Sequence, residues 1–395
     1  MIGGQIDIAI VGGGLAGGLI ALATRQANPL LSIALFEAGQ TFGGNHRWSW
    51  FEGDLDKKGE ALLAPFAKAE WTGGNEVRFP GHSRRLAGNY RSLDSREFDA
   101  CLRQLLPQEA IRTGSRVLGL DAQGITLENG ERIAAKAVID CRDAGRSEHL
   151  TGGWQIFLGQ HWRTDRPHGI ARPIIMDATV DQPGAYRFVY VLPLAEDEVF
   201  IEDTYYADDP VLHADTLKDR IAAYAASHGW QGEVVHEETG LLPVITGGDF
   251  DAYRASLAVP GVALAGARGG FVHPLTSYTV PIAVRNALAL AEASRGDLSA
   301  LPEFAARRAQ DHWRNTHYYR MLGKMLFQAA IPEERYRVFE RFYRLPEGLI
   351  ERFYSAQSTS LDKLRILTGR PPVAIGKAVK ALLGKGAPLR QGHIQ

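Results

Sequence analysis

Cysteines, long apolar runs and metal-ligand spacings are scarce in this sequence of 395 residues, and each absence excludes a class of protein. Cys101 and Cys141 are the only cysteines, too few for a disulfide framework, so a reducing cytoplasm is expected. No uncharged apolar run reaches the ~18 residues of a membrane-spanning helix, and Asp7 with its neighbouring glycines interrupts any secretory signal. No spacing of histidine, cysteine and carboxylate is typical of a metal site, and no G-x-S-x-G elbow is present. The sequence therefore predicts a globular cytoplasmic protein without a metal.

Charge is distributed unevenly along the chain, although the net charge is only −1. From residue 304 to the end there are 17 lysines and arginines against seven aspartates and glutamates, and the remainder holds 27 against 38. This asymmetry predicts that residues 301–395, which read as basic helices with interleaved aromatic rings, face an anionic partner. Two interpretations stay open, a helical bundle with a buried aromatic core and helices lying on anionic lipid. Nucleic acid is not expected, because the rest of the chain is acidic.

The opening of the chain carries a dinucleotide-binding motif. The apolar run of residues 6–11 predicts a strand, which leads directly into Gly12-Gly13-Gly14-Leu15-Ala16-Gly17 and then into an Ala/Leu-rich helix. In such a turn the first glycine permits the tight bend, the second lets the backbone approach a pyrophosphate, and the third lets helix and strand pack closely. The pyrophosphate then lies on the free N–H groups at the positive end of the helix.

A second predicted strand indicates which dinucleotide is bound. It ends in Glu37, about 20 residues after the glycines, where an acid is placed for a ribose hydroxyl. Gly43-Gly44-Asn45-His46 follows soon after, and a Gly-Gly pair at this place resembles the extended fingerprint of glutathione-reductase-like flavoproteins. The sequence therefore favours FAD over NAD, with a glycine-rich turn that binds no ligand as the alternative.

The order of the remaining segments predicts an α/β fold with α+β elements, in which a Rossmann-like FAD/NAD(P)-binding domain is interrupted by an inserted sheet. Residues 93–106 read as a helix capped by Asp94 or Ser95, and residues 186–192 and 199–206 read as an aromatic hairpin. The predicted units are a discontinuous FAD-binding domain (1–60, 91–150 and 258–300), an antiparallel substrate-binding sheet domain (61–90 and 151–257) and a C-terminal helical region (301–395).

Several segments taken together closely resemble the bacterial lycopene β-cyclases of carotenoid biosynthesis. The resemblance spans nearly the whole chain, in motifs that flavoproteins at large do not share. The matching stretches are Gly43-Gly44-Asn45-His46 with Trp48-Ser49, Pro173 to Gln182, Tyr186 to Tyr190, Ile201 to Thr204, His273-Pro274, Arg320 to Leu322, Met325 to Phe327, and Leu345-Pro346-Glu347 through Arg370-Pro371-Pro372. The resemblance implies an FAD enzyme that converts the linear ψ-ends of lycopene into β-rings, giving γ-carotene and β-carotene, without net redox change. It also implies reduced FAD as the active form and NAD(P)H as the electron donor.

The motif and the resemblance together give the candidate cofactor residues. In the third cofactor segment Arg268 stands where many flavoprotein relatives have Asp, a departure that the cyclases share and that favours a cyclase over a hydroxylase. His46 and His273 are expected to line the flavin, although a lone histidine is more often structural. The candidates are Gly12, Gly13, Gly14, Leu15, Ala16, Gly17, Glu37, Gly44, Asn45, His46, Asp140, Gly266, Gly270 and His273.

Cyclisation begins with protonation of a nearly non-basic double bond, which needs an acid in a dry pocket that stabilises a cation. A carboxyl group with a pKa raised by apolar surroundings holds a proton at neutral pH, and aromatic faces stabilise the cation. Glu202 and Asp203 lie in an apolar, aromatic strand whose successive residues point to opposite faces, so only one of them can face a given pocket. The resemblance assigns the acid/base role to Glu202, and Asp203 and Asp177 are the other candidate acids. The alternatives are a surface carboxylate at 202 and a turn aspartate at 177.

Two other functions share these features. One is an FAD-dependent monooxygenase resembling the aromatic hydroxylases, which would consume NAD(P)H and oxygen, and the other is a flavin- or carotenoid-binding protein without catalysis. Because a C40 hydrocarbon has no useful solubility in water, we expect a cytoplasmic enzyme that associates peripherally with the inner membrane through its basic C-terminal region. Its expected partners are lycopene, the monocyclic intermediate and the lipid surface.

Overall fold

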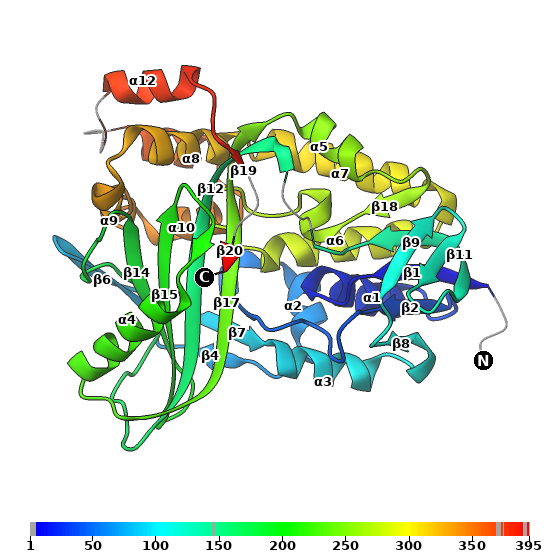
Figure 1. Cartoon of the computed structure of the whole chain (residues 1–395), viewed down its shortest axis with the longest axis horizontal. Coiled ribbons are helices and arrows are strands. Elements are labelled where there is room, and N and C mark those ends of the chain that lie inside the picture. The colour runs from blue at the N-terminus through cyan, green and yellow to red at the C-terminus, as the bar shows by residue number, and fades with distance from the viewer. Residues whose placement is uncertain (1–4, 144–146, 369–372, 374, 390–392, 395) are drawn as a thin grey trace.

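The architecture combines a nucleotide-binding domain, a large antiparallel sheet and a group of C-terminal helices (Figure 1). The computed structural model describes residues 5–143, 147–368, 373, 375–389 and 393–394. The last residues of the family-like stretches, Arg370 to Pro372, lie outside the described part of the chain.

A parallel sheet forms the centre of the nucleotide-binding domain. Strand β1 (Ile6–Val11) lies between β2 (Ile33–Phe36) and β11 (Arg132–Asp140) and is parallel to both. Strands β8 (Ile111–Arg112) and β18 (Val262–Leu264) extend the parallel order on the two sides. Helices cover both faces of such a sheet, so the side chains on both sides of each strand are buried and apolar. Residues 6–11 have this continuous apolar pattern, from which the sequence predicted a strand.

Helices pack on this sheet through apolar faces. Helix α1 (Leu15–Ala27) follows the glycine turn and packs against α6 (Val280–Ala293), which begins close to Pro281 as predicted. Helix α3 (Ser95–Leu105) is capped by Asp94, whose carboxylate accepts from the N–H of Arg96 at 2.8 Å. Helix α2 (Lys57–Leu63) is capped in the same way by Asp56.

Two antiparallel strands extend this sheet, and a separate three-stranded sheet lies beside the domain. Strands β9 (Val117–Asp121) and β10 (Gly124–Leu127) continue antiparallel from β11. Strands β3 (Arg47–Phe51) and β4 (Ala69–Trp71) pair with β7 (Tyr90–Asp94) in a three-stranded sheet that borders the large one.

The large sheet is built mainly from the middle of the chain. Its central strands are β12 (Ser147–Thr164), β15 (Glu198–Ala207) and β14 (Tyr186–Pro193), and β14 and β15 form the predicted hairpin. On one side, β17 (Gly232–Gly248) pairs with β12 and forms the edge of the sheet. On the other side, β13 (Ile174–Asp177), β5 (Asn75–Phe79) and β6 (His82–Leu86) follow β14 in that order. Helix α4 (Ala214–Ser227) packs on the face of β12 and β15 that is turned away from the nucleotide-binding domain.

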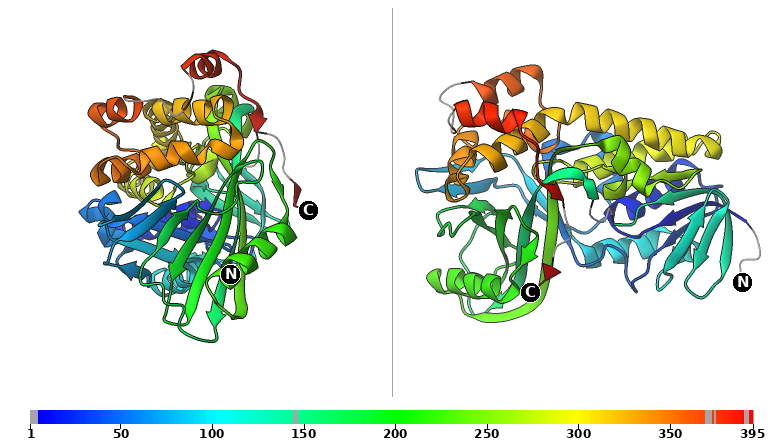
Figure 2. Two further views of the ribbon diagram at one scale, coloured as in Figure 1. Left: turned by 90° about the vertical axis from the view of Figure 1, so that its left-hand side faces the viewer. Right: turned by 45° about the horizontal axis from the view of Figure 1, so that its top comes forward.

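The C-terminal helices gather above the large sheet, and the first of them runs along the nucleotide-binding domain (Figure 2). They are α7 (Leu301–Asn315), α8 (His317–Ala329), α9 (Tyr336–Phe342), α10 (Glu347–Tyr354), α11 (Ser360–Leu367) and α12 (Ile375–Leu383). No helix in the described part of the chain is long and apolar enough to cross a bilayer. Within its described residues the predicted helical region holds these six α-helices, and two short strands follow them: β19 (Pro388–Leu389) pairs with β12, and β20 (His393–Ile394) pairs with β16 (Val211–Leu212).

Candidate functional site

The glycine turn after β1 has the geometry that a bound pyrophosphate needs. Gly12 has a φ of +100°, which favours glycine, and a Cβ at Gly17 would lie 2.0 Å from the carbonyl oxygen of Gly12. A Cβ at Gly14, by contrast, meets nothing within 4 Å. Gly12 and Gly17 therefore allow strand and helix to meet, whereas Gly14 keeps the space in front of α1 open. The first turn of α1 carries no acidic residue, so no carboxylate neutralises the partial positive charge of the helix N-terminus that faces this space.

A cavity of about 610 Å³ lies in front of this turn and is called here the dinucleotide cavity. Seven of the predicted cofactor residues line it, namely Gly12, Gly14, Leu15, Ala16, Glu37, His46 and Gly266. The Glu37 carboxylate accepts from the N–H groups of Gly13 and Gly39, each at 2.8 Å, and keeps further lone pairs for a ribose hydroxyl. Sequence reasoning missed Arg116 and Arg142, two cations that also line the cavity and suit an anionic ligand. The size, the open glycine and the charge all fit a dinucleotide such as FAD.

Other predicted cofactor residues lie outside this cavity. Gly13 and Gly17 pack inside the turn, where a Cβ would collide with Phe42 or with the backbone. Gly44 and Asn45 are exposed on the following loop, and the Asn45 amide donates to the carbonyl of Glu237 at 2.8 Å. Asn45 thus fastens the loop to the large sheet.

Three further predicted cofactor residues, Asp140, Gly270 and His273, also do not line this cavity. Asp140 is buried at the end of β11 and forms ion pairs with Arg142 and Arg268 at 2.8 and 2.9 Å, which also accounts for the arginine in the third cofactor segment. Gly270 faces the ring of Phe250. His273 is fully buried: its Nε2 donates to the carbonyl of Phe353 at 3.0 Å and its Nδ1 accepts backbone N–H groups. Burial lowers the pKa of His273 to about 3, so this ring is a neutral structural group.

A second cavity, of about 270 Å³, adjoins the first and is called here the glutamate cavity. His46 and Thr279 line both cavities and mark the place where they meet. Eleven residues of its lining are aromatic, including Trp48, Tyr190 and Tyr206, so a cation formed inside would meet ring faces on several sides. Among the described residues that line it, only Glu202 and Glu238 carry a carboxyl group.

Glu202 points into this cavity from β15, as the strand alternation allowed. Its Oε1 accepts from the hydroxyl of Thr204, two residues along the same face, at 2.6 Å. Burial raises the pKa of Glu202 to about 7, and the hydrogen bond from Thr204 partly opposes that rise. At neutral pH this carboxyl group therefore exists in both its protonated and ionised forms.

Glu238 is a second acid that sequence reasoning missed. In the register of the sheet, Gly159 of β12 lies opposite Glu202 on one side and opposite Glu238 of β17 on the other. The two glutamates therefore share a face two strands apart, about 10 Å between Cα atoms. The ring of Phe200 and the Cγ of Glu238 lie over Gly159 in the space that a side chain there would fill. Burial first, and then the charge of Glu202, raise the pKa of Glu238 to about 9. Glu238 thus holds its proton at neutral pH.

The other two candidate acids lie outside the glutamate cavity. Asp203 points to the opposite face of β15, is completely buried, and binds the guanidinium of Arg187 at 2.5 and 2.8 Å. Asp177 is buried as well and accepts from the hydroxyls of Thr179 at 2.5 Å and Tyr224 at 2.9 Å. Both carboxylates are thus engaged by side chains outside that cavity.

Comparison with known proteins decides the family. Residues 7–380 match the family described as lycopene cyclase protein. The chain belongs to the lycopene cyclase family. A lycopene β-cyclase of Pseudescherichia vulneris is 45% identical over 378 residues, covering 95% of this chain and 97% of that protein. A lycopene β-cyclase of a Paracoccus species is 43% identical over 385 residues, with 95% and 97% covered. The resemblance seen in the sequence is therefore confirmed.

Solved structures confirm the fold. A geranylgeranyl bacteriochlorophyll reductase-like protein from Thermoplasma acidophilum has a TM-score of 0.58 at 14% identity, covering 96% of this chain and 98% of its own. A probable FAD-dependent monooxygenase from Pseudomonas aeruginosa has a TM-score of 0.57 at 16% identity, covering 87% and 100%. At these identities the likeness shows an α/β flavoprotein fold, as predicted. Among the described residues no group of three or more histidines, cysteines and carboxylates could hold a metal ion.

Proposed function

We propose that this protein is a lycopene β-cyclase that closes both ψ-ends of lycopene to β-rings, through a monocyclic intermediate, by acid/base chemistry. The observation that carries the proposal is the pair Glu202 and Glu238. These two carboxyl groups, the first half-buried and the second buried, have raised pKa values and line an aromatic cavity that adjoins a dinucleotide cavity. The family of the chain supports the choice of substrate.

The Glu202 carboxyl donates its proton to the terminal double bond, which leaves a tertiary cation. The next double bond attacks that cation and closes the ring, and the ring cation then loses one proton to a carboxylate. One proton is added and one is removed, so no electrons are transferred overall. The rings of Trp48, Tyr190 and Tyr206 stabilise the cation, by about 2 kcal/mol for a desolvated cation on one ring.

Glu238 contributes a neutral partner for this proton transfer. Its proton remains bound while Glu202 titrates, because the pKa of Glu238 is the higher of the two. The pair therefore carries no more than about one negative charge when Glu202 has donated its proton. A single carboxylate beside the cation lowers its energy and accepts the departing ring proton.

Gly12, Gly14, Glu37 and Gly266 hold FAD in the dinucleotide cavity, with the pyrophosphate at the start of α1. Reduced FAD, with NAD(P)H as its electron donor, would supply an electron-rich ring to the chemistry when bound. His46, at the junction of the two cavities, is the residue placed to contact both the cofactor and the substrate. The enzyme works in the cytoplasm, associated peripherally with the inner membrane, where its hydrocarbon substrate is dissolved.

Anaerobic incubation with lycopene and chemically reduced FAD tests this function. We expect β-carotene to form while the flavin stays reduced. Product that forms only with oxygen, together with loss of NAD(P)H in equal amounts, would identify a monooxygenase. Bound lycopene that is recovered unchanged under all conditions would identify a carotenoid-binding protein.

A further inference from the structure

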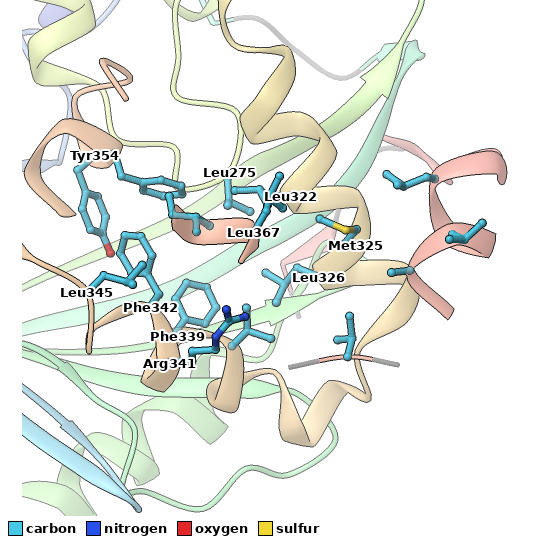
Figure 3. A pocket seen from close by; sticks show the side chains of 17 residues that line it. Leu275, Leu322, Met325, Leu326, Phe339, Arg341, Phe342, Leu345, Tyr354 and Leu367 are labelled. Carbon is cyan, nitrogen blue, oxygen red and sulfur yellow. The ribbon is translucent and has the colours of Figure 1, made fainter. Parts of the chain in front are cut away.

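A third cavity, of about 240 Å³, lies among the C-terminal helices and is called here the apolar cavity (Figure 3). Leucine, methionine, valine and phenylalanine side chains from α8 to α12 form most of its wall, and Arg341 is the single charged residue among the described residues that line it. Phe339 and Tyr354 line both the apolar cavity and the glutamate cavity. The rings of Phe339 and Tyr354 thus form part of the wall between the two cavities.

The glutamate cavity alone is small for a C40 hydrocarbon. Its volume of about 270 Å³ lies below the ~300–1,000 Å³ of pockets that enclose drug-sized ligands. When one ψ-end reaches Glu202, the rest of the polyene must lie outside this cavity. The apolar cavity starts at the shared rings and offers an apolar path for that part of the molecule.

The far end of the apolar cavity opens on the protein surface. Leu367 of α11 and Val379 and Leu382 of α12 line it, yet 49%, 51% and 40% of their surface is exposed. Leu361 and Leu383 lie on the same two helices and are exposed by 77% and 83%. Exposed apolar residues gathered around a cavity mouth mark a surface that another apolar phase covers.

The charge on this surface indicates what covers it. Arg365 of α11, Lys377 and Lys380 of α12, and Lys385 after it are exposed, and within the part of the chain that the structure describes no ion pair engages them. The one acid of α11, Asp362, is held by Arg352 at 2.7 Å. Cations beside exposed leucines on short amphipathic helices are typical of a surface that lies on anionic lipid. The sequence left two interpretations of the C-terminal region open, and each fits a different part of it. The aromatic rings of α8 to α10, such as Tyr319 and Phe353, are buried, as in a helical bundle. The surface of α11 and α12 carries the lipid-facing character.

We propose that the apolar cavity is a binding subsite for the distal polyene chain, and that its mouth at α11 and α12 docks on anionic lipid so that the hydrocarbon passes from the bilayer to Glu202. This inference rests on the proposed function for the nature of the ligand. Figure 1 supports the geometry, because α12 lies at the outer edge of the molecule, on the side away from the nucleotide-binding sheet.

Liposome flotation tests the docking surface without requiring catalysis. Leu361→Asp and Leu383→Asp should each reduce binding to anionic vesicles about tenfold, because each removes one leucine from the lipid phase. Leu30→Asp is the matched control, since Leu30 is 95% exposed in the turn between α1 and β2, and it should bind like the unaltered protein. Equal binding by all three variants would overturn the docking surface. Self-association that is lost in Leu383→Asp, without vesicle binding, would instead identify an interface between two copies of the chain.

Turnover tests the subsite. Ala378→Trp fills the apolar cavity from α12, and Met325→Trp fills it from α8. Both variants should keep bound FAD and lose at least about tenfold in turnover, whether lycopene is supplied in vesicles or in detergent. Leu383→Asp should lose turnover with vesicles only. Full turnover by both tryptophan variants would overturn the subsite, whereas absence of cyclisation by the unaltered protein would count against the proposed function and leave the flotation result standing.

Discussion

Removing the hydroxyl of Thr204 should shift the pH range of cyclisation upward. Thr204 donates to Glu202 at 2.6 Å, and this bond favours the ionised carboxylate and holds the pKa of Glu202 down against the effect of burial. Thr204→Val keeps the branched shape and removes the donor. A hydrogen bond to a charged group contributes about 1.5–3 kcal/mol, and one pKa unit corresponds to about 1.36 kcal/mol. The pKa of Glu202, about 7, should therefore rise by at least roughly one unit.

The protonated form of Glu202 is the active one, so activity falls as the pH rises through its pKa. At pH 8 a carboxyl group with a pKa of about 7 is protonated in about one molecule in eleven, and one with a pKa of about 8 in about half. The variant should accordingly be about fivefold faster than the unaltered enzyme at pH 8, measured as initial rate of β-carotene formation with saturating reduced FAD.

A matched control comes from a similar pair elsewhere in the sheet. Thr179 donates to Asp177, also two residues apart, but outside the glutamate cavity. Thr179→Val should leave the midpoint of the pH–rate profile unchanged. In Thr204→Val the pH at which activity has fallen by half on the alkaline side should rise. If that pH is unchanged or lower, the alkaline loss of activity does not come from ionisation of Glu202.

Four further substitutions probe the framework of the site. Gly14→Ala should fold with unchanged thermal stability but bind FAD weakly by flavin absorbance, whereas Gly17→Ala should lose stability as well, because only the second Cβ collides with protein backbone. Asp203→Asn should lower the free energy of unfolding by about 3–5 kcal/mol, because Arg187 is left buried without its counter-charge, and the protein that remains folded should still cyclise lycopene. The pKa of His273 is about 3 in the folded protein and about 6.5 when unfolded. The free energy of unfolding should therefore decrease below pH 6.5, by about 1.4 kcal/mol per pH unit from this residue alone. When that free energy is measured by urea titration at several pH values, its dependence on pH should be weaker by this amount in His273→Gln.

Local signals in the sequence predicted the features that depend on neighbouring residues. The strand, glycine turn and helix of residues 6–27 follow from sterics within one segment, and so does the Asp94 cap of α3. Strand alternation separated Glu202 from Asp203 onto opposite faces, although it did not say which face bordered a cavity. What packs on the two faces of the sheet decided that: the face of Ile201 and Asp203 packs on α4, and the opposite face, with Glu202, borders the glutamate cavity.

Features that depend on distant pairing were missed for a physical reason. Glu238 joins the site through the register of β17 on β12, more than 70 residues away along the chain, and a shift of one residue would turn it to the other face. Asp140 and His273 were assigned to the cofactor because they flank the right strands. Their polar atoms are instead used by Arg142, Arg268 and the backbone of α10, contacts that no local pattern indicates.

Cyclisation in deuterium oxide tests most directly whether a carboxyl group of the protein protonates the hydrocarbon. The proton of Glu202 exchanges with solvent, so each new ring should carry one deuterium, and mass spectrometry should show two in β-carotene. Glu202→Gln should bind FAD normally and form no labelled ring. Unlabelled β-carotene from the unaltered enzyme, or labelled β-carotene from Glu202→Gln at the normal rate, would contradict the account.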